Sequence, residues 1–574
     1  MSWLRPYQEE CRASVIGELS NGSSSTLYVV PTGCGKTEIA MSLLETWPDQ
    51  DCGILCLSHR EELVHQPWER WHRRHGEYCE MEMGEYRRNR HGHRITFASK
   101  DSLHPDRLTA AFPDPKSVGL IWVDEAHHLA KKNESYQHIV RYFMEGNPDC
   151  RLFGCTATPD RKEEMAMAET FDSVAFDFPL YDPSGASSAI GDGWLVPIEQ
   201  EYIVVDELNF ERVGSRGGDF IDSQLQSMIL EDKGLYRITS ATKELAGDKS
   251  TLCFGSGIQM AISQAAIFNA EEDGCARAIV SRVDKGIEQD YVIHSRDKES
   301  RRQTLRRWGR GAFQFMCNVG VFTEGMDEPS IGCVSMGRPT KSRSLYAQMA
   351  GRGTRILPGV IEGEGWRHET AAGRKAAIAA RAKTSVLLLD FVGNSKHSLL
   401  ISSVDLLGGR YEDDVIERAK ERISNGDRQD VQQALEAARL EVDEELEKRR
   451  RVRAKAESIK RRQVDPFTTM KVVPTREPGW HKGRRPTSGQ RRALDKFKVE
   501  KSEVDGMSFW QASQLLDKLI QSASNGMATY KQRKLLVKHE FSPDVSFDEA
   551  KATIDRIAQS GWKLKGRVNE PAPF

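Results

Sequence analysis

The stretch PTGCGKT, from Pro31 to Thr37, constrains the fold more than any other part of this 574-residue chain. It follows an apolar run, LYVV, and precedes a helix-forming run that begins at Glu38. A strand, a glycine-rich turn and a helix in this order form a phosphate-binding loop, whose backbone N–H groups surround phosphate oxygens at the helix N-terminus. Val30 stands where the general pattern has its first glycine. The stretch predicts a nucleotide site in an α/β domain, without saying which kind of protein carries it.

Individual residues of this loop have distinct expected roles. Gly33 and Gly35 leave backbone N–H groups free to approach phosphate, Lys36 can reach the β and γ phosphates, and Thr37 can ligate magnesium. The residues expected to bind the phosphates are Thr32, Gly33, Cys34, Gly35, Lys36 and Thr37.

A pair of carboxylates follows a later apolar run. Asp124 and Glu125 end the predicted strand LIWV and are followed by Ala126 and His127. An aspartate at a strand end can hold Mg²⁺ through water, and an adjacent glutamate can orient and deprotonate an attacking water. The alternative is an ordinary acidic turn, but pairing with the phosphate loop favours ATP hydrolysis.

Composition limits the classes of protein that remain. The length exceeds what one hydrophobic core can serve and suggests roughly three or four domains. The 82 basic and 84 acidic residues nearly cancel, so any basic surface for nucleic acid must be local. No apolar run approaches the ~20 residues of a bilayer span, and the start MSWLRPYQEE has no signal-peptide pattern, so we expect no membrane partner and a cytoplasmic location. The eleven cysteines form no paired CxxC sets and are expected to be reduced thiols.

Two series of short apolar runs alternate with helical stretches. The first comprises LYVV, GILCLS, RITFAS, GLIWVDEA and RLFGCTATP, and the second TLCFGSG, ARAIVSR, QDYVIHS, QFMCNVG, GCVSMGR and SVLLLDFV. Alternation of this kind predicts parallel sheets covered by helices on both faces. We therefore expect an α/β fold with two tandem domains, joined through a glycine-rich stretch between Asp182 and Gly193.

Taken together, these motifs resemble those of the superfamily 2 helicases and translocases, over residues 1 to about 400 and in the same order. The motifs that carry the resemblance are RPYQ from Arg5, LSHREEL with Gln66, TFASKDSL, DEAH from Asp124, TATP from Thr156, CFGSG, VFTEGMDEP from Val321 and QMAGRGTR from Gln348 to Arg355. Gln348 stands where DEAD-box RNA helicases usually have histidine. The RPYQ element, LSHREEL and RPTKSRSLYAQ, which ends at Gln348, resemble segments of the translocating subunits of type I and type III restriction enzymes and of the xeroderma group B type repair helicases. Those proteins act mainly on duplex DNA.

The resemblance implies ATP and Mg²⁺ as cofactors and assigns roles to residues that match the motifs. Arg5 and Gln8 would flank the adenine, and Asp327 would face the ribose. The implied catalytic residues are Lys36, Asp124, Glu125, Arg352 and Arg355, with Thr37 and Asp124 at the metal. The implied contacts to the nucleic-acid backbone are His59, Arg60, Ser99 and Thr323, and the residues coupling hydrolysis to movement are Thr156, Thr158 and Gln348.

The region after the second α/β domain is expected to be helical. Two short-helix pairs repeat there: Thr487, Gln490, Arg491, Leu494 and Lys496 recur 42 residues later as Thr529, Gln532, Arg533, Leu536 and Lys538. The segments TSGQ, SFWQ, TYKQ and SFDE each match the capping box that begins a helix. Between Lys482 and Lys498 there are seven Lys or Arg against one Asp, which offers a phosphate-binding surface, whereas the second pair is more acidic around Asp544. A protein-docking role is the alternative.

We expect four segments: a RecA-like ATP-binding domain over 1–185, a RecA-like helicase C-terminal domain over 190–400, a charged helical linker over 410–475 and the tandem helical-hairpin module over 476–574. The leading hypothesis is an ATP-dependent DNA helicase or translocase for repair, recombination or replication. The alternatives are the motor of a restriction or phage-defence system, an RNA helicase, and a nucleic-acid-binding scaffold whose ATPase site is silent. The Lys36, Glu125 and Arg352 set speaks against the last of these.

Overall fold

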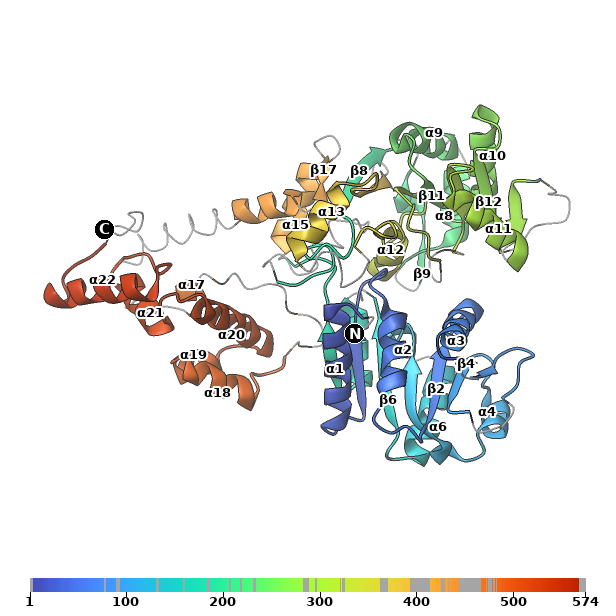
Figure 1. Cartoon of the computed structure of the whole chain (residues 1–574). Helices are drawn as coiled ribbons and strands as arrows, with labels where there is room; N and C mark the ends of the chain where they lie inside the picture. The colour runs from blue at the N-terminus through green and yellow to red at the C-terminus, as the bar shows by residue number, and fades with distance from the viewer. Residues whose placement is uncertain are drawn as a thin grey trace. The chain divides into compact units, whose positions relative to one another are not determined.

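The chain divides into two compact units in the computed structural model (Figure 1). The first unit consists of Met1–Gly409 with Asp413–Glu441, and the second of Arg410–Glu412 with Val442–Phe574. The structure describes residues 4–76, 79–88, 93–130, 134–157, 161–182, 186–205, 208–216, 219–230, 234–281, 289–294, 297–320, 322, 326–361, 370–392, 413–424, 429–431, 433–442, 466–470, 472, 477, 481 and 483–566. Much of the expected linker, from 443 to 465, therefore lies outside the described residues.

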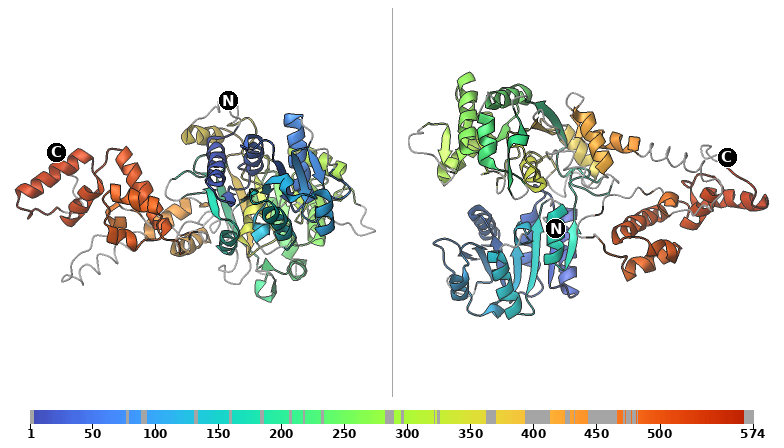
Figure 2. Two further views of the ribbon diagram at one scale, coloured as in Figure 1. Left: turned by 90° about the horizontal axis from the view of Figure 1, so that it is seen from below. Right: turned by 180° about the vertical axis from the view of Figure 1, so that it is seen from behind.

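A seven-stranded parallel sheet forms the centre of the first α/β domain, with strand order β3-β4-β2-β5-β6-β1-β7. The strands are β1 (Ser25–Val29), β2 (Gly53–Ser58), β3 (Glu80–Glu82), β4 (Ile95–Ser99), β5 (Val118–Val123), β6 (Arg151–Thr156) and β7 (Ser173–Asp177). The helices are α1 (Pro6–Ser20), α2 (Lys36–Thr46), α3 (Glu61–His75), α4 (Pro105–Ala111), α5 (His127–Ala130), α6 (Glu134–Gly146) and α7 (Arg161–Thr170). Helices flank both faces of the sheet (Figures 1 and 2), as the alternating pattern predicts.

Large aromatic side chains pack between neighbouring strands of this sheet. Tyr28 of β1 and Trp122 of β5 each stack on Phe153 of β6, with ring centroids 6.4 Å apart in both pairs. All three side chains are fully buried. The apolar runs of the sequence therefore form strands because each buries its side chains on both faces of the sheet.

A second sheet of eight strands has the order β13-β12-β14-β11-β15-β16-β8-β17. Only β17 is antiparallel to its neighbour. Its strands are β8 (Ile198–Val204), β11 (Thr251–Phe254), β12 (Ala276–Val280), β13 (Val292–His294), β14 (Phe315–Asn318), β15 (Cys333–Met336), β16 (Val386–Val392) and β17 (Gln429–Asp430). Between β8 and β11 in the chain, β9 (Ser215–Arg216) and β10 (Asp219–Phe220) form a separate two-stranded antiparallel ribbon. The helices are α8 (Asp222–Leu230), α9 (Gly234–Ala246), α10 (Ile258–Glu271), α11 (Lys298–Gly309), α12 (Arg343–Ala350), α13 (Ala371–Ala379) and α15 (Asp413–Ser424).

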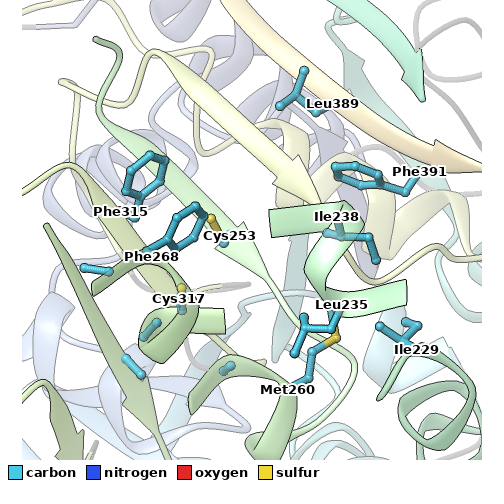
Figure 3. Close-up of a cluster of buried hydrophobic side chains, with 14 of the residues drawn as sticks. Ile229, Leu235, Ile238, Cys253, Met260, Phe268, Phe315, Cys317, Leu389 and Phe391 are labelled. Atoms are coloured by element: carbon cyan, nitrogen blue, oxygen red, sulfur yellow. The ribbon is translucent and has the colours of Figure 1, made fainter. Parts of the chain in front are cut away.

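The core of the second domain lies between this sheet and the helices that pack on it (Figure 3). Phe268 of α10 stacks on Phe315 of β14 with ring centroids 3.9 Å apart. Ile238 of α9 packs in the same cluster as Leu389 and Phe391 of β16. The two α/β domains expected from the sequence are thus present, and each has its own sheet and core.

The second unit is entirely helical over its described residues. Its helices are α17 (Pro466–Met470), α18 (Ser488–Lys496), α19 (Lys501–Asp505), α20 (Phe509–Ser524), α21 (Tyr530–Lys538) and α22 (Phe547–Gln559). The capping boxes expected at Thr487, Ser508, Thr529 and Ser546 are all formed. In each box the hydroxyl accepts from a backbone N–H three residues on, and the Gln or Glu side chain accepts from the backbone N–H of the capping residue. The four predicted helix starts are confirmed.

The eleven cysteines are all unpaired thiols, and ten of them are buried. Across the described ranges, no helix has both the length and the apolar character that a membrane crossing requires.

Candidate active site

The phosphate loop follows β1 and ends where α2 begins. Gly33 and Gly35 have φ values of +89° and +80°, a left-handed backbone that favours glycine. A Cβ atom on Gly35 would lie only 2.5 Å from Nε2 of Gln8, so a larger residue would collide with that amide. Lys36 and Thr37 are the first residues of α2, where backbone N–H groups lack partners within the helix. The loop can therefore offer N–H groups to phosphate as the sequence predicts.

Helix α1 supports the loop from one side. The hydroxyl of Tyr7 and the Nε2 amide of Gln8 both donate to the carbonyl of Cys34, at 2.7 and 2.9 Å. Gln8 also accepts a hydrogen bond from the backbone N–H of Arg5 at 2.8 Å. Gln8 is thus held in place by its neighbours, and Tyr7 is a supporting residue that the motif comparison did not single out.

The two carboxylates of the DEAH segment lie next to the lysine of the loop. Glu125 Oε1 is 3.5 Å from Lys36 Nζ, and both Asp124 and Glu125 are buried. Glu125 has a φ of +49°, which is rare for a residue with a side chain and costs of order 1–3 kcal/mol. The surrounding structure must hold this backbone in place, as is typical of a functional position.

The two carboxyl groups have pKa values displaced in opposite directions. Burial, and then the charge of Glu125, raises the pKa of Asp124 to about 6, although the Sγ of Cys155 donates to its Oδ1 at 3.2 Å. Burial acts to raise the pKa of Glu125 too, but the nearby charges of Lys36 and His127 bring it below the ordinary value. Glu125 is therefore ionised at neutral pH and able to accept a proton.

A histidine connects these carboxylates with β6. His127 Nδ1 lies 3.5 Å from Glu125 Oε2 and 3.1 Å from Oγ1 of Thr156, the first expected coupling residue. His128 lies between two other rings, with centroids 4.2 Å from His127 and 4.0 Å from His59. Neither of these adjacent histidines had an expected role, and only their position after the two carboxylates could have indicated one.

The second domain brings its arginines to the same loop. A Cβ atom on Gly33 would lie 3.3 Å from Cγ of Arg355, and one on Gly351 would lie 2.8 Å from Cβ of Thr32. Arg355 forms an ion pair with Asp327, and burial, then the charge of Arg70, lowers its pKa to about 10. Arg355 stays protonated at neutral pH and lies against the phosphate loop.

Three further polar side chains of the second domain are buried. Arg352 is buried and donates from Nη1 to the carbonyl of Met326 at 2.7 Å. Gln348 is buried on α12, one turn before Arg352. Lys383, which the motif comparison missed, is buried and donates to the carbonyl of Pro329 at 2.8 Å. Burial, and then the charge of Arg355, lowers the pKa of Lys383 to about 7.

Aromatic rings and arginine side chains pack near Arg5 and Tyr7, in the element expected to flank the adenine. Tyr7 stacks on Phe178, with centroids 4.4 Å apart. The guanidinium of Arg5 lies 5.2 Å from the ring centroid of Trp194, and that of Arg374 lies 3.8 Å from the same centroid. Trp194 and Arg374 come from outside the recognised motifs, so sequence alone did not indicate them.

The residues expected to contact nucleic acid each have different neighbours in the structure. His59 packs on His128, and Arg60 donates to the carbonyl of Gly320 in the second domain at 3.2 Å. Ser99 ends β4 and is buried, with its carbonyl accepting from the N–H of Ser102 at 3.0 Å. Thr323 and the coupling residue Thr158 lie outside the described residues.

Comparison with known proteins supplies independent information on both domains. Residues 2–161 match the family described as "Type III restriction enzyme, res subunit", and residues 248–357 match the "Helicase conserved C-terminal domain". A Saccharomyces cerevisiae protein named as a candidate ATP-dependent helicase, IRC3, is 27% identical over 424 residues, which are 71% of this chain and 54% of that protein. A Schizosaccharomyces pombe protein named as a candidate mitochondrial ATP-dependent helicase is 27% identical over 368 residues, 62% of this chain and 55% of that protein. The chain thus spans about half the length of these curated relatives.

Among solved structures, S. cerevisiae Dbp5 bound to RNA and ADP BeF3 is 12% identical, with a TM-score of 0.44. The match covers 74% of this chain and 98% of that one.

Proposed function

We propose that this chain, whose two α/β domains are those of the superfamily 2 helicases, hydrolyses ATP with Mg²⁺ and couples hydrolysis to movement on duplex DNA. The observation that carries the proposal is that side chains from both α/β domains lie at the phosphate loop. Lys36 lies beside Glu125, and Arg355 of the second domain lies against Gly33 of the same loop. Such an arrangement makes the fit between the two domains depend on what the loop binds.

The residues present suit ATP with magnesium. A loop with two left-handed glycines at the start of a helix presents N–H groups that favour phosphate. Thr37 and Asp124 supply a hydroxyl and a carboxylate, the oxygen ligands that Mg²⁺ prefers. Magnesium bound there would neutralise phosphate charge, and the pKa of about 6 leaves Asp124 mostly ionised at pH 7 to hold it. Arg5 and Gln8 are the proposed adenine-side residues, and Asp327 the ribose-side residue.

The chain's own groups then have separable roles in hydrolysis. Glu125 accepts the proton of the attacking water, and its lowered pKa keeps the carboxylate ionised for this role. Lys36, Arg352 and Arg355 place positive charge where negative charge develops on the phosphoryl group. The role that we assign to Thr156 is to link the occupied site to β6, and its 3.1 Å contact with His127 Nδ1 supports this role. Thr158 and Gln348 are proposed to serve the same coupling.

Duplex DNA is proposed as the track because Gln348 and the RPYQ element resemble those of duplex DNA motors. His59, Arg60, Ser99 and Thr323 are the proposed backbone contacts, which position a protein without reading sequence. A specific observation favours a second candidate, the motor of a restriction or phage-defence system, since residues 2–161 match a restriction-enzyme family. We also propose the four segments with the boundaries 185, 190, 400, 410, 475 and 476, and a cytoplasmic location. One similar protein is named as mitochondrial.

The test is ATPase activity measured in parallel with duplex DNA, single-stranded DNA and RNA. We expect duplex DNA to stimulate turnover most. Lys36→Ala and Arg352→Ala should lower turnover ~10³-fold or more, whereas Glu125→Gln should lower turnover yet still bind ATP. Near-wild-type turnover in any of the three variants would contradict the assigned site. Stimulation by RNA alone would favour an RNA helicase, and a wild-type protein that binds nucleic acid without hydrolysing ATP would favour a scaffold.

A further inference from the structure

The second unit contains two related helical repeats, and the first helix of each repeat and the turn after it can be compared position by position. The first repeat includes α18 and α20, and the second α21 and α22. Thr487 and Thr529 form the same capping box 42 residues apart. The turns that follow the first helix of each repeat both contain a left-handed residue, Lys498 at φ +64° and Glu540 at φ +66°. Since the backbones correspond, differences between equivalent side chains are informative.

One arginine has the same structural role in both repeats. Nε of Arg491 donates to the carbonyl of Pro486 at 3.2 Å, and Nε of the equivalent Arg533 donates to the carbonyl of Ala528 at 3.0 Å. Each arginine also pairs with an aspartate of its own repeat, Asp505 for Arg491 and Asp544 for Arg533. This position therefore holds the repeat together and contributes little free charge to either surface.

The next position differs sharply between the repeats. Lys534 of the second repeat bonds to Glu500 at 2.7 Å and to Glu503 at 2.9 Å, which are acids of the first repeat. The equivalent Arg492 is exposed, and within the described part of the chain it pairs with no carboxylate. Lys534 of the second repeat thus neutralises acidic residues of the first repeat.

Five cations of the first repeat other than Arg491, which we call the α18 basic face, form no ion pair with any residue that the structure describes. It consists of Arg484, Arg485, Arg492, Lys496 and Lys498, all of them exposed. Asp495 is the acid within this stretch, while Asp505 is already paired with Arg491. At the position equivalent to Lys498, the second repeat has Glu540, which pairs with Lys565 at 3.1 Å.

Two cations of this face lie on the same side of one helix. Arg492 and Lys496 lie four residues apart and so on one side of α18, where like charges repel by a few tenths of a kcal/mol. An anion with regularly spaced charges would remove this repulsion. The phosphate backbone of nucleic acid has that property, and arginine binds phosphate through paired N–H groups.

We propose that the α18 basic face binds the phosphate backbone of nucleic acid, and that the second repeat is its structural support. The inference deepens the proposed function, on which it rests for the presence of nucleic acid. Such contacts raise affinity without selecting sequence, so the repeat would keep a motor on its track.

The test compares two triple variants of the full chain. The first is Arg492→Gln with Lys496→Gln and Lys498→Gln. The matched control removes three exposed lysines of the second repeat, by Lys531→Gln, Lys538→Gln and Lys551→Gln. Binding of labelled duplex DNA, single-stranded DNA and RNA is measured by fluorescence anisotropy over a series of salt concentrations, together with ATPase activity.

We expect the first variant to bind duplex DNA roughly 100-fold more weakly at 0.15 M salt, with a slope of log affinity against log salt that is flatter by about 2 to 3. The control should stay within about twofold of wild type, and basal ATPase should be unchanged in both. Equal affinities of the first variant and wild type, or an equal loss in the control, would overturn the inference and leave a protein-docking role for the repeats. If wild type itself binds no nucleic acid, the proposed function fails instead.

Discussion

Arg533→Ala should open the second helical repeat far more than Arg491→Ala opens the first, although the two arginines occupy equivalent positions. The side chain of Arg533 is only 4% exposed, and it bonds to the Ala528 carbonyl, the Ser522 hydroxyl and Asp544 at 3.0, 3.0 and 2.6 Å. The side chain of Arg491 is 36% exposed, and its partner Asp505 is 54% exposed. The same substitution therefore removes a buried network at Arg533, whereas at Arg491 it removes a surface ion pair and one long hydrogen bond to the Pro486 carbonyl.

The magnitudes follow from this difference in burial. Hydrogen bonds to a charged group contribute about 1.5–3 kcal/mol each, but those in one network do not add, so we expect about 3 kcal/mol for Arg533. An exposed ion pair contributes about 0.2–1 kcal/mol, so we expect about 1 kcal/mol for Arg491. The difference of about 2 kcal/mol corresponds to a factor of roughly 30 in an opening equilibrium.

Hydrogen–deuterium exchange of the full chain measures this opening helix by helix. In Arg533→Ala, peptides from α21 and α22 should lose about 30-fold more protection than peptides from α18 and α20 lose in Arg491→Ala. The first α/β domain serves as the internal reference, since neither substitution touches it. Equal losses in the two repeats, or a greater loss for Arg491→Ala, would refute the argument from burial.

Three further outcomes are expected. Thr156→Val keeps the shape of the side chain but removes the 3.1 Å contact with His127, and it should lower nucleic-acid-stimulated ATPase at least tenfold while ATP binding, measured by titration, stays within threefold. His128→Ala removes the ring between His59 and His127, and it should reduce the ratio of stimulated to basal turnover; an unchanged ratio would show that these rings serve packing alone. Burial acts to raise the pKa of Asp172, but hydrogen bonds from Ser24 and Ser25 lower it below the ordinary value. The ionised form of Asp172 therefore stabilises the fold at pH values above the pKa of the unfolded state, which is about 4. Asp172→Asn should therefore lower the melting temperature at pH 7, and the gap from wild type should close as pH falls below about 4.

Local features were predictable because they depend on neighbouring residues. The capping boxes at Thr487 and Thr529 need only a hydroxyl and an amide three residues apart. The strand before the phosphate loop and the strand before Asp124 are short apolar runs bounded by turns, and both formed as expected. These patterns, with the motifs they position, determined two α/β domains, a nucleotide loop and its adjacent carboxylates.

Strands that do not look apolar were missed. β3 has the sequence EME, yet Glu80 and Glu82 are buried because Arg88 and Arg107 pair with them. Such a strand is possible only where cations from outside the strand neutralise its carboxylates, and the alternation of apolar and polar residues does not reveal such pairs. β8 was missed for a related reason: its sequence IEQEYIV is half polar, and its seven residues are paired with β16, far along the chain.

The tertiary structure alone decided which residues meet at the site. Arg355 and Gly33 are separated by more than 300 residues, and only the packing of the two domains brings them into contact. His59, expected from its motif to contact nucleic acid, packs on His128, whose ring also lies against His127. The sequence by itself thus determined which chemical groups are present and on which elements they lie, because periodicity, capping and loop chemistry act over a few residues. Their distances, burial and pKa values depend on contacts between segments far apart in the chain, so they exist only once both sheets have formed.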